Sequence, residues 1–119
     1  MLTMHIENLD DLTVVECKGR IVRSDSVTKL RDLVTAQSSS VIVLDLFDVD
    51  AISGGALGML VFLSRWAGQR NIRLKLFNPS RKVLEGLVNN RTILDFEIAG
   101  FHEMMRLVME SGRTRAVAA

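Results

Sequence analysis

The sequence predicts a single α/β domain, in which strands alternate with helices around one core. Residues 41–44 are a continuous, mostly β-branched apolar run, which is typical of a strand covered on both faces. Apolar residues recur at helical spacing in the segments on either side of this run. The length of 119 residues suits one domain, and a hydrophobic content of 48% is ordinary for a globular protein. These observations favour alternating strands and helices with at least one parallel strand pair.

The N-terminal part predicts a hairpin followed by a helix. Residues 4–7 and 12–20 are strand-like and are separated by a polar turn, so an antiparallel hairpin is expected, with Gly19 closing its second strand. Residues 24–37 then keep a helical apolar period, and Ser24 or Asp25 is expected to cap the first turn. Cys17 lies in the second strand, where a small buried hydrophobe is the simple explanation.

The central segment predicts a buried strand, an acidic turn and a second helix. Asp45 is expected at the end of this strand, and Asp48 and Asp50 are expected in a solvated turn that follows it. Ser53 is expected to cap the helix that begins near Gly55, which places free backbone donors near the end of the strand. Such a junction can hold an anion or an acceptor group of a partner, which indicates a binding surface.

The second helix carries two apolar stripes rather than one. At about 100° per residue, one stripe contains Leu57, Leu60 and Val61, and the other contains Met59, Phe62, Leu63 and Trp66. One stripe is enough to hold a helix on a sheet. The second stripe either packs beneath a neighbouring helix of the same chain or forms a surface for a partner or a second copy.

The remaining segments continue the alternation. Residues 72–77 are expected to form a strand, and residues 78–80 start a short helix that carries Val83, Leu84 and Leu87. Residues 96–98 suit a last strand and residues 102–110 a terminal helix that Gly112 ends. The expected division is a domain over residues 1–112 and a mobile tail over residues 113–119.

Composition argues against several classes of function. A net charge of +1 gives no field for nucleic acid, and the absence of tyrosine leaves few stacking platforms. No apolar run is long enough for membrane insertion, and one cysteine suits a reducing, cytoplasmic location. His5 and His102 have no ligands at spacings typical of metal sites, so neither a metal nor another cofactor is expected. No nucleophile, base and acid constellation is visible, so the chain is not expected to be an enzyme.

The chain resembles the STAS domain family of bacterial anti-sigma factor antagonists over nearly its whole length, from residue 4 to about 109. The residues that carry the resemblance are Gly19 to Val22, Val41 to Leu46, Val49, Ile52, Leu57, Gly58, and Leu74 to Phe77 followed by Val83, Leu84 and Leu87. The resemblance implies a central mixed sheet with about four to five strands and four helices. It also implies a non-enzymatic module that sequesters an anti-sigma factor of the serine-kinase type and so regulates transcription.

In that family an Asp-Ser-Ser/Thr-Gly motif at a helix start holds the phosphorylated residue, and the matching positions here are Ser53, Gly54, Gly55 and Ala56. Gly55 stands where the acceptor hydroxyl would be, so the resemblance implies a chain that cannot be switched there. The expected partner surface is Ser53, Gly54, Gly55 and Ala56 with Met59 and Phe62, joined by Ser24 and Asp25. Ser53 as a displaced phosphoacceptor is a second interpretation.

Two further interpretations follow from the same residues. Similar domains serve as cytoplasmic accessory subunits bound to the ATPase of a lipid-transporting ABC system, a role that needs no phosphorylatable serine. A homodimer formed through Met59, Phe62 and Trp66 would use the same exposed apolar residues as binding to a different protein.

Overall fold

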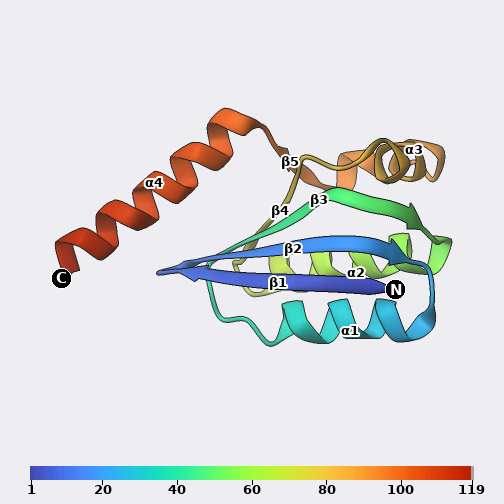
Figure 1. The fold of residues 1–119 in the computed structure, drawn as a ribbon, viewed down its shortest axis with the longest axis horizontal. Coiled ribbons are helices and arrows are strands. Elements are labelled where there is room, and N and C mark those ends of the chain that lie inside the picture. Colours follow the sequence, from blue (N-terminus) through green and yellow to red (C-terminus); the bar gives the residue numbers. More distant parts are fainter. Residues whose placement is uncertain (119) are drawn as a thin grey trace.

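One mixed sheet organises the molecule, with strands in the order β1-β2-β3-β4-β5 (Figure 1). The computed structural model describes the backbone of residues 1–118 and the side chains of residues 1–111. The elements in chain order are β1 (Leu2–Leu9), β2 (Leu12–Ile21), α1 (Ser24–Thr35), β3 (Val41–Ile52), α2 (Gly54–Gln69), β4 (Arg73–Phe77), α3 (Arg81–Asn89), the 3-10 helix η1 (Ile93–Asp95), β5 (Glu97–Ala99) and α4 (Phe101–Ala118). The predicted α/β domain with a mixed sheet and four α-helices is therefore confirmed within the described residues.

The N-terminal hairpin forms as expected, and the other strands are parallel. β1 pairs antiparallel with β2 from Leu2 opposite Gly19 to Leu9 opposite Leu12, whereas β2, β3, β4 and β5 pair in parallel. Gly19 does not close β2, which continues to Ile21. Its φ of +113° is rare for other residues, and a Cβ there would lie 2.1 Å from the Met1 carbonyl oxygen. Glycine is thus required at position 19, where the Met1 carbonyl just before β1 lies close to the backbone of β2.

The expected acidic turn after the central strand is wrong, because β3 continues through it to Ile52. The pairing of β3 with β2 shifts register twice, between Glu16 and Lys18 and between Gly19 and Arg20. Val49 is buried, whereas Asp48 and Asp50 are exposed. The acidic residues therefore flank a core residue along a strand that has one face exposed to solvent. The sequence pattern was that of a bulged strand rather than of a loop.

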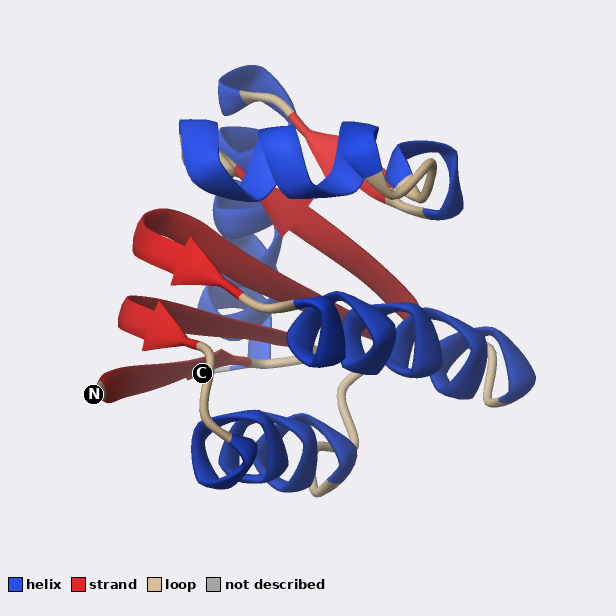
Figure 2. Cartoon of the chain, turned by 90° about the vertical axis from the view of Figure 1, so that its right-hand side faces the viewer, coloured by secondary structure: helices blue, strands red, loops and turns tan. Residues whose placement is uncertain are grey.

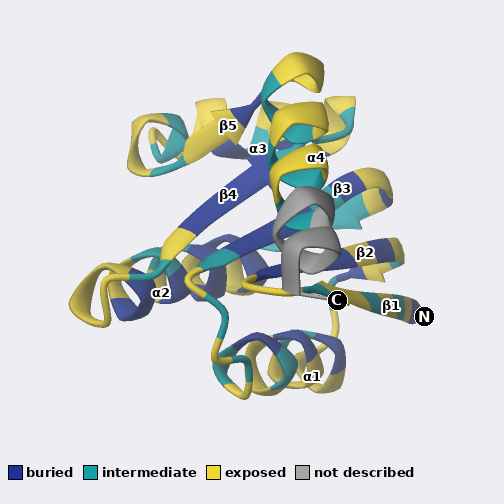
Figure 3. Cartoon of the chain, turned by 90° about the vertical axis from the view of Figure 1, so that its left-hand side faces the viewer, coloured by how far each residue is buried: buried dark blue, intermediate teal, exposed yellow. Residues whose placement is uncertain are grey.

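The two faces of the sheet carry separate apolar clusters. Helices α1, α2 and α3 cover one face, where Leu30, Leu60 and Leu87 join the main core (Figure 2). Helix α4 covers part of the other face, where Met104, Leu107 and Val108 pack on Leu12, Val14 and Val43 (Figure 3). Helix α4 covers only part of that second face. Polar side chains of β1, β2 and β3 therefore remain accessible there, including His5, Glu16 and Asp48.

Helix α4 runs to Ala118, so Gly112 does not end it. The side chains of residues 112–119 lie outside the described residues, and the division into a domain over 1–112 and a mobile tail over 113–119 stays a prediction. Among the described residues, none of the helices combines the length and the apolar character that crossing a bilayer requires.

A buried lysine fixes the start of α4 to the sheet. The Lys75 side chain is 4% exposed, and its ammonium lies 2.7 Å from a Glu97 carboxylate oxygen and 2.5 Å from one of Glu103. Burial alone lowers the pKa of Lys75, but the hydrogen bonds to Glu103 and Glu97 and the negative charges of these two residues together outweigh it, so this pKa is raised above its ordinary value. The hydrogen bond from Lys75 likewise holds the pKa of Glu97 below its ordinary value.

This cluster predicts a loss of stability in acid that depends on Glu97. A carboxyl group whose pKa is lowered by folding contributes stability above its unfolded pKa of about 4.3, and this contribution is lost as the pH falls through the lower folded value. Glu97→Gln is therefore expected to flatten the decline of the urea midpoint below about pH 4.5. Glu85→Gln, which removes an exposed pair with Arg81, is the control. An unchanged acid profile in Glu97→Gln contradicts the prediction.

Candidate functional site

The candidate site is the corner where β2 and β3 end and where α1 and α2 begin. Both strands are parallel, so their C-terminal ends lie at the same edge of the sheet. The Ser53 N–H donates to the Ile21 carbonyl at 3.0 Å, which ties the start of α2 to the end of β2. Open α/β sheets bind ligands outside the carboxyl ends of their strands, where loops and helix N-termini converge. Ser53, Gly54 and Gly55 thus lie beside the segment that leads to Ser24 and Asp25.

Ser53 caps α2, as the sequence predicts. Its Oγ accepts a hydrogen bond from the Ala56 N–H at 3.1 Å, and its carbonyl accepts from the Leu57 N–H at 3.0 Å. The first turn of α2 contains no acidic residue. The partial positive charge of this helix end is therefore not offset by a carboxylate of its own first turn.

Gly54, Gly55, Gly58 and Phe62 form an exposed surface along α2, which we call the glycine strip. Gly54, Gly58 and Phe62 are four residues apart and so lie on one side of the helix, and Phe62 is 50% exposed. A Cβ at Gly54 or Gly58 would meet no atom within 4 Å, and one at Gly55 would meet the Ser53 Oγ at 3.8 Å. Packing therefore does not require glycine at these positions, and the strip exposes backbone that a partner can approach closely.

Two residues of the expected surface are buried. Ala56 is completely buried and Met59 is 7% exposed, and both belong to the main core, so neither side chain is presented to a partner. Leu63 and Trp66 are buried with them, and the Arg70 guanidinium lies 5.1 Å from the centre of the Trp66 ring. The second apolar stripe thus packs mainly within the chain, which was the first of the two interpretations. Phe62 is its exposed member.

Ser24 and Asp25 are both exposed near the corner, but neither caps α1. The N-cap residue is Arg23, which makes no side-chain cap, and Ser24 is the first residue of the helix. Asp25 lies 3.6 Å from the Arg23 side chain and accepts a hydrogen bond from the Ser26 N–H at 3.0 Å. The expected cap is therefore wrong by one residue, and Asp25 satisfies a donor within the first turn instead.

Sequence reasoning missed Gly58 as a surface residue and a polar group on the open sheet face. Gly58 follows Gly54 by four residues, a spacing that could have identified it. His5, Glu7 and Glu16 are all exposed, with ligand atoms within 4.8 Å of one another. Residues 5 and 7 share a face of a strand, and the hairpin register places Glu16 opposite His5, so a residue count across the turn could have found the group. Cys17 is buried on the other face, and burial raises the pKa of its thiol to about 12.

A family model provides the first comparison. The model described as the STAS domain matches residues 3–112. A comparison with curated proteins found no match.

Solved structures of anti-sigma factor antagonists share the fold. The antagonist SpoIIAA in its unphosphorylated form superposes with a TM-score of 0.72 at 15% identity, covering 91% of this chain and 97% of that chain. The Bacillus cell fate determinant SpoIIAA in the phosphorylated form gives 0.69 at 14% identity, covering 89% and 99%. An anti-sigma factor antagonist from Mycobacterium paratuberculosis gives 0.72 at 16% identity, covering 92% and 95%. At these identities the likeness establishes the fold.

Proposed function

Because the chain belongs to the STAS domain family, we propose that it is a non-enzymatic anti-sigma factor antagonist. In this proposal it acts in the cytoplasm, where it sequesters an anti-sigma factor of the serine-kinase type and so regulates transcription. The match over residues 3–112 and the fold shared with anti-sigma factor antagonists support it. The observation that carries the proposal is the glycine strip, which is exposed and begins at the corner where we propose the partner contact.

The glycine strip suits a protein partner that packs directly on the helix backbone. Without side chains at Gly54, Gly55 and Gly58, a partner can approach α2 more closely than an ordinary helix surface allows. Phe62 supplies an aromatic side chain at the end of the strip, of the kind that contributes strongly when a partner buries it. Ser24 and Asp25 extend the proposed contact onto the start of α1.

We propose that this contact is not switched by phosphorylation within the chain. Gly55 has no hydroxyl group, so the charge of about −1.5 to −2 that a phosphate adds cannot be placed there. Ser53 does have a hydroxyl group, but this group caps α2 through the Ala56 N–H, and Ser53 is only partly exposed. In this proposal Ser53 stays unmodified and binding is constitutive.

Gly55→Arg is expected to weaken binding of the anti-sigma factor by at least about tenfold, which corresponds to about 1.4 kcal/mol. The added side chain would stand in the surface that the partner must approach. Gly68→Arg is the matched control, since Gly68 is exposed on the same helix with nothing within 4 Å of a Cβ, about 20 Å further along its axis. Titration calorimetry with candidate anti-sigma kinases measures both. Equal binding by wild type and Gly55→Arg shows that the surface is misplaced.

The missing acceptor at Gly55 also favours the accessory role in a lipid-transporting ABC system, which needs no phosphorylation. Purification from the native cell separates the two functions, because the first predicts a serine kinase and the second an ATPase as the bound protein.

The homodimer has less support, since Met59 and Trp66 are buried within the chain and leave Phe62 alone at the surface. The molecular mass of the protein in solution shows whether it is a monomer or a dimer.

A further inference from the structure

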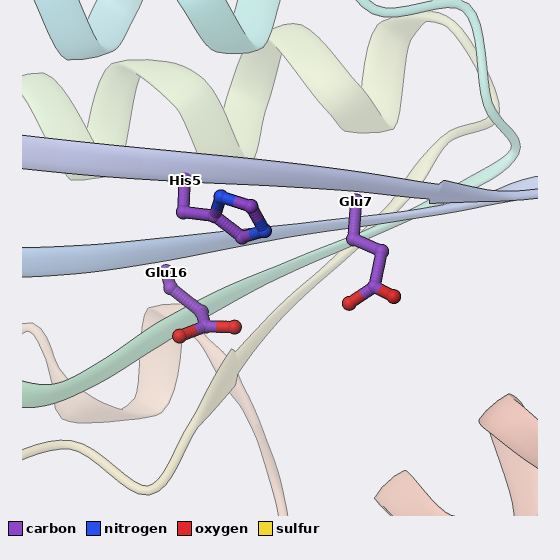
Figure 4. A group of neighbouring side chains, drawn as sticks. All are labelled: His5, Glu7 and Glu16. Carbon is purple, nitrogen blue, oxygen red and sulfur yellow. The ribbon is translucent and has the colours of Figure 1, made fainter.

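A histidine and two glutamates converge on the N-terminal hairpin, on the sheet face opposite α1 and α2 (Figure 4). His5 and Glu7 alternate with Met4 along β1, and Glu16 alternates with Val15 along β2, while Met4 and Val15 pack in the main core. Their side chains therefore project from the opposite face. His5 lies directly across from Glu16 in the pairing of β1 with β2. The two strands thus hold all three groups on one rigid surface.

We propose that His5, Glu7 and Glu16 bind one divalent first-row transition-metal ion, with Zn²⁺ as the reference ion. One imidazole nitrogen and two carboxylate oxygens are a ligand set that zinc accepts in proteins, at bond lengths of about 2.0–2.2 Å. Tetrahedral ligands at that distance are about 3.4 Å apart. The three ligand atoms already lie within 4.8 Å of one another, and small rotations of exposed side chains close the difference.

The charge of the group favours a cation. With a neutral imidazole, Glu7 and Glu16 give the group two negative charges, which a divalent ion neutralises. His5 and Glu16 also line a small hollow of about 120 Å³ with Asp45, whose carboxylate adds to the negative potential, and with Lys18, whose ammonium opposes it. Three protein ligands leave a fourth position of a tetrahedral ion for water or for a donor from another molecule. The site lies on the opposite sheet face from α2, so the inference does not depend on the proposed function.

Titration of the tag-free full-length chain with zinc chloride, followed by calorimetry, tests the proposal. The expected result is saturable binding of one ion per chain. His5→Gln and Glu16→Gln are each expected to weaken it by at least about tenfold, because each removes one of three ligands. Both side chains are exposed, so the variants should keep the fold, which circular dichroism checks. In heteronuclear NMR spectra, zinc should shift the amide signals of β1 and β2.

His102→Gln is the matched control, since His102 is the other histidine of the chain and is exposed on α4. This variant should bind zinc as the wild type does. Equal loss in His102→Gln and His5→Gln, or wild-type affinity in both His5→Gln and Glu16→Gln, overturns the proposal. Absence of saturable binding at millimolar zinc overturns it as well.

Discussion

The Gly55→Ser variant is expected to accept a phosphate from a serine kinase of the anti-sigma type, whereas the wild-type chain accepts none. The substitution adds a hydroxyl group at the position that we propose to correspond to the acceptor of the family motif. The structure has room for it, because a Cβ at Gly55 would meet only the Ser53 Oγ, at 3.8 Å. Serine is also a better helix former than glycine by about 0.5 kcal/mol, so the fold should be retained.

Intact mass after incubation with kinase and ATP, followed by peptide mapping, measures this outcome. Gly68→Ser is the control, since it adds a hydroxyl group to an exposed site at the other end of α2 and should stay unmodified. Once phosphorylated, Gly55→Ser should bind the kinase at least about tenfold more weakly, because the added charge opposes close docking. Phosphate on Ser53 of the wild type would show instead that the acceptor is displaced, and an unmodified Gly55→Ser would remove the match of position 55 to the acceptor.

Met59→Ala is expected to lower stability and Phe62→Ala to weaken partner binding, although both residues lie on the second apolar stripe of α2. Met59 is 7% exposed and packs in the main core, so its truncation should lower the free energy of unfolding by about 2–5 kcal/mol. Phe62 is half exposed, so Phe62→Ala should change stability by about 1 kcal/mol or less and should instead weaken partner binding. Urea unfolding and calorimetry with the anti-sigma factor separate the two effects.

Leu94→Ala is the control for the binding arm, because Leu94 is 94% exposed in η1, outside α2. Its truncation should alter neither stability nor partner binding. If Phe62→Ala destabilises the chain as much as Met59→Ala, the assignment of the exposed side of α2 is incorrect. If Phe62→Ala binds as tightly as Leu94→Ala, Phe62 does not belong to the partner surface.

Features that depend on local chemistry could be predicted from the sequence. The hairpin followed from a polar turn between two strand-like runs, and the pairing of Leu9 with Leu12 confirms it. The Ser53 cap followed from a serine just before a helical apolar period, and its hydrogen bond to the Ala56 N–H confirms it. Both features are decided by a few neighbouring residues, so a single sequence contains the information.

Features that depend on distant neighbours could not be read in the same way. The segment containing Asp48 and Asp50 was interpreted as a turn, but β2 supplies a ladder that keeps it extended to Ile52. The burial of Met59 depends on packing around α2 that periodicity does not reveal. The group of His5, Glu7 and Glu16 lies on two different strands, so finding it required counting residues across the turn rather than reading one segment at a time.

Helix α4 follows all five strands in the chain, and this order has a consequence during synthesis. The cluster of Leu12, Val14 and Val43 packs against Met104, Leu107 and Val108 of α4, and its remaining described neighbours are the strand residues Leu9, Val41 and Phe77. While the ribosome adds the residues between Val43 and Val108, at about 5–20 residues per second, Leu12, Val14 and Val43 lack the cover of α4 for seconds. A nascent polypeptide of this sequence therefore exposes an apolar patch that chaperones can bind until its last helix emerges.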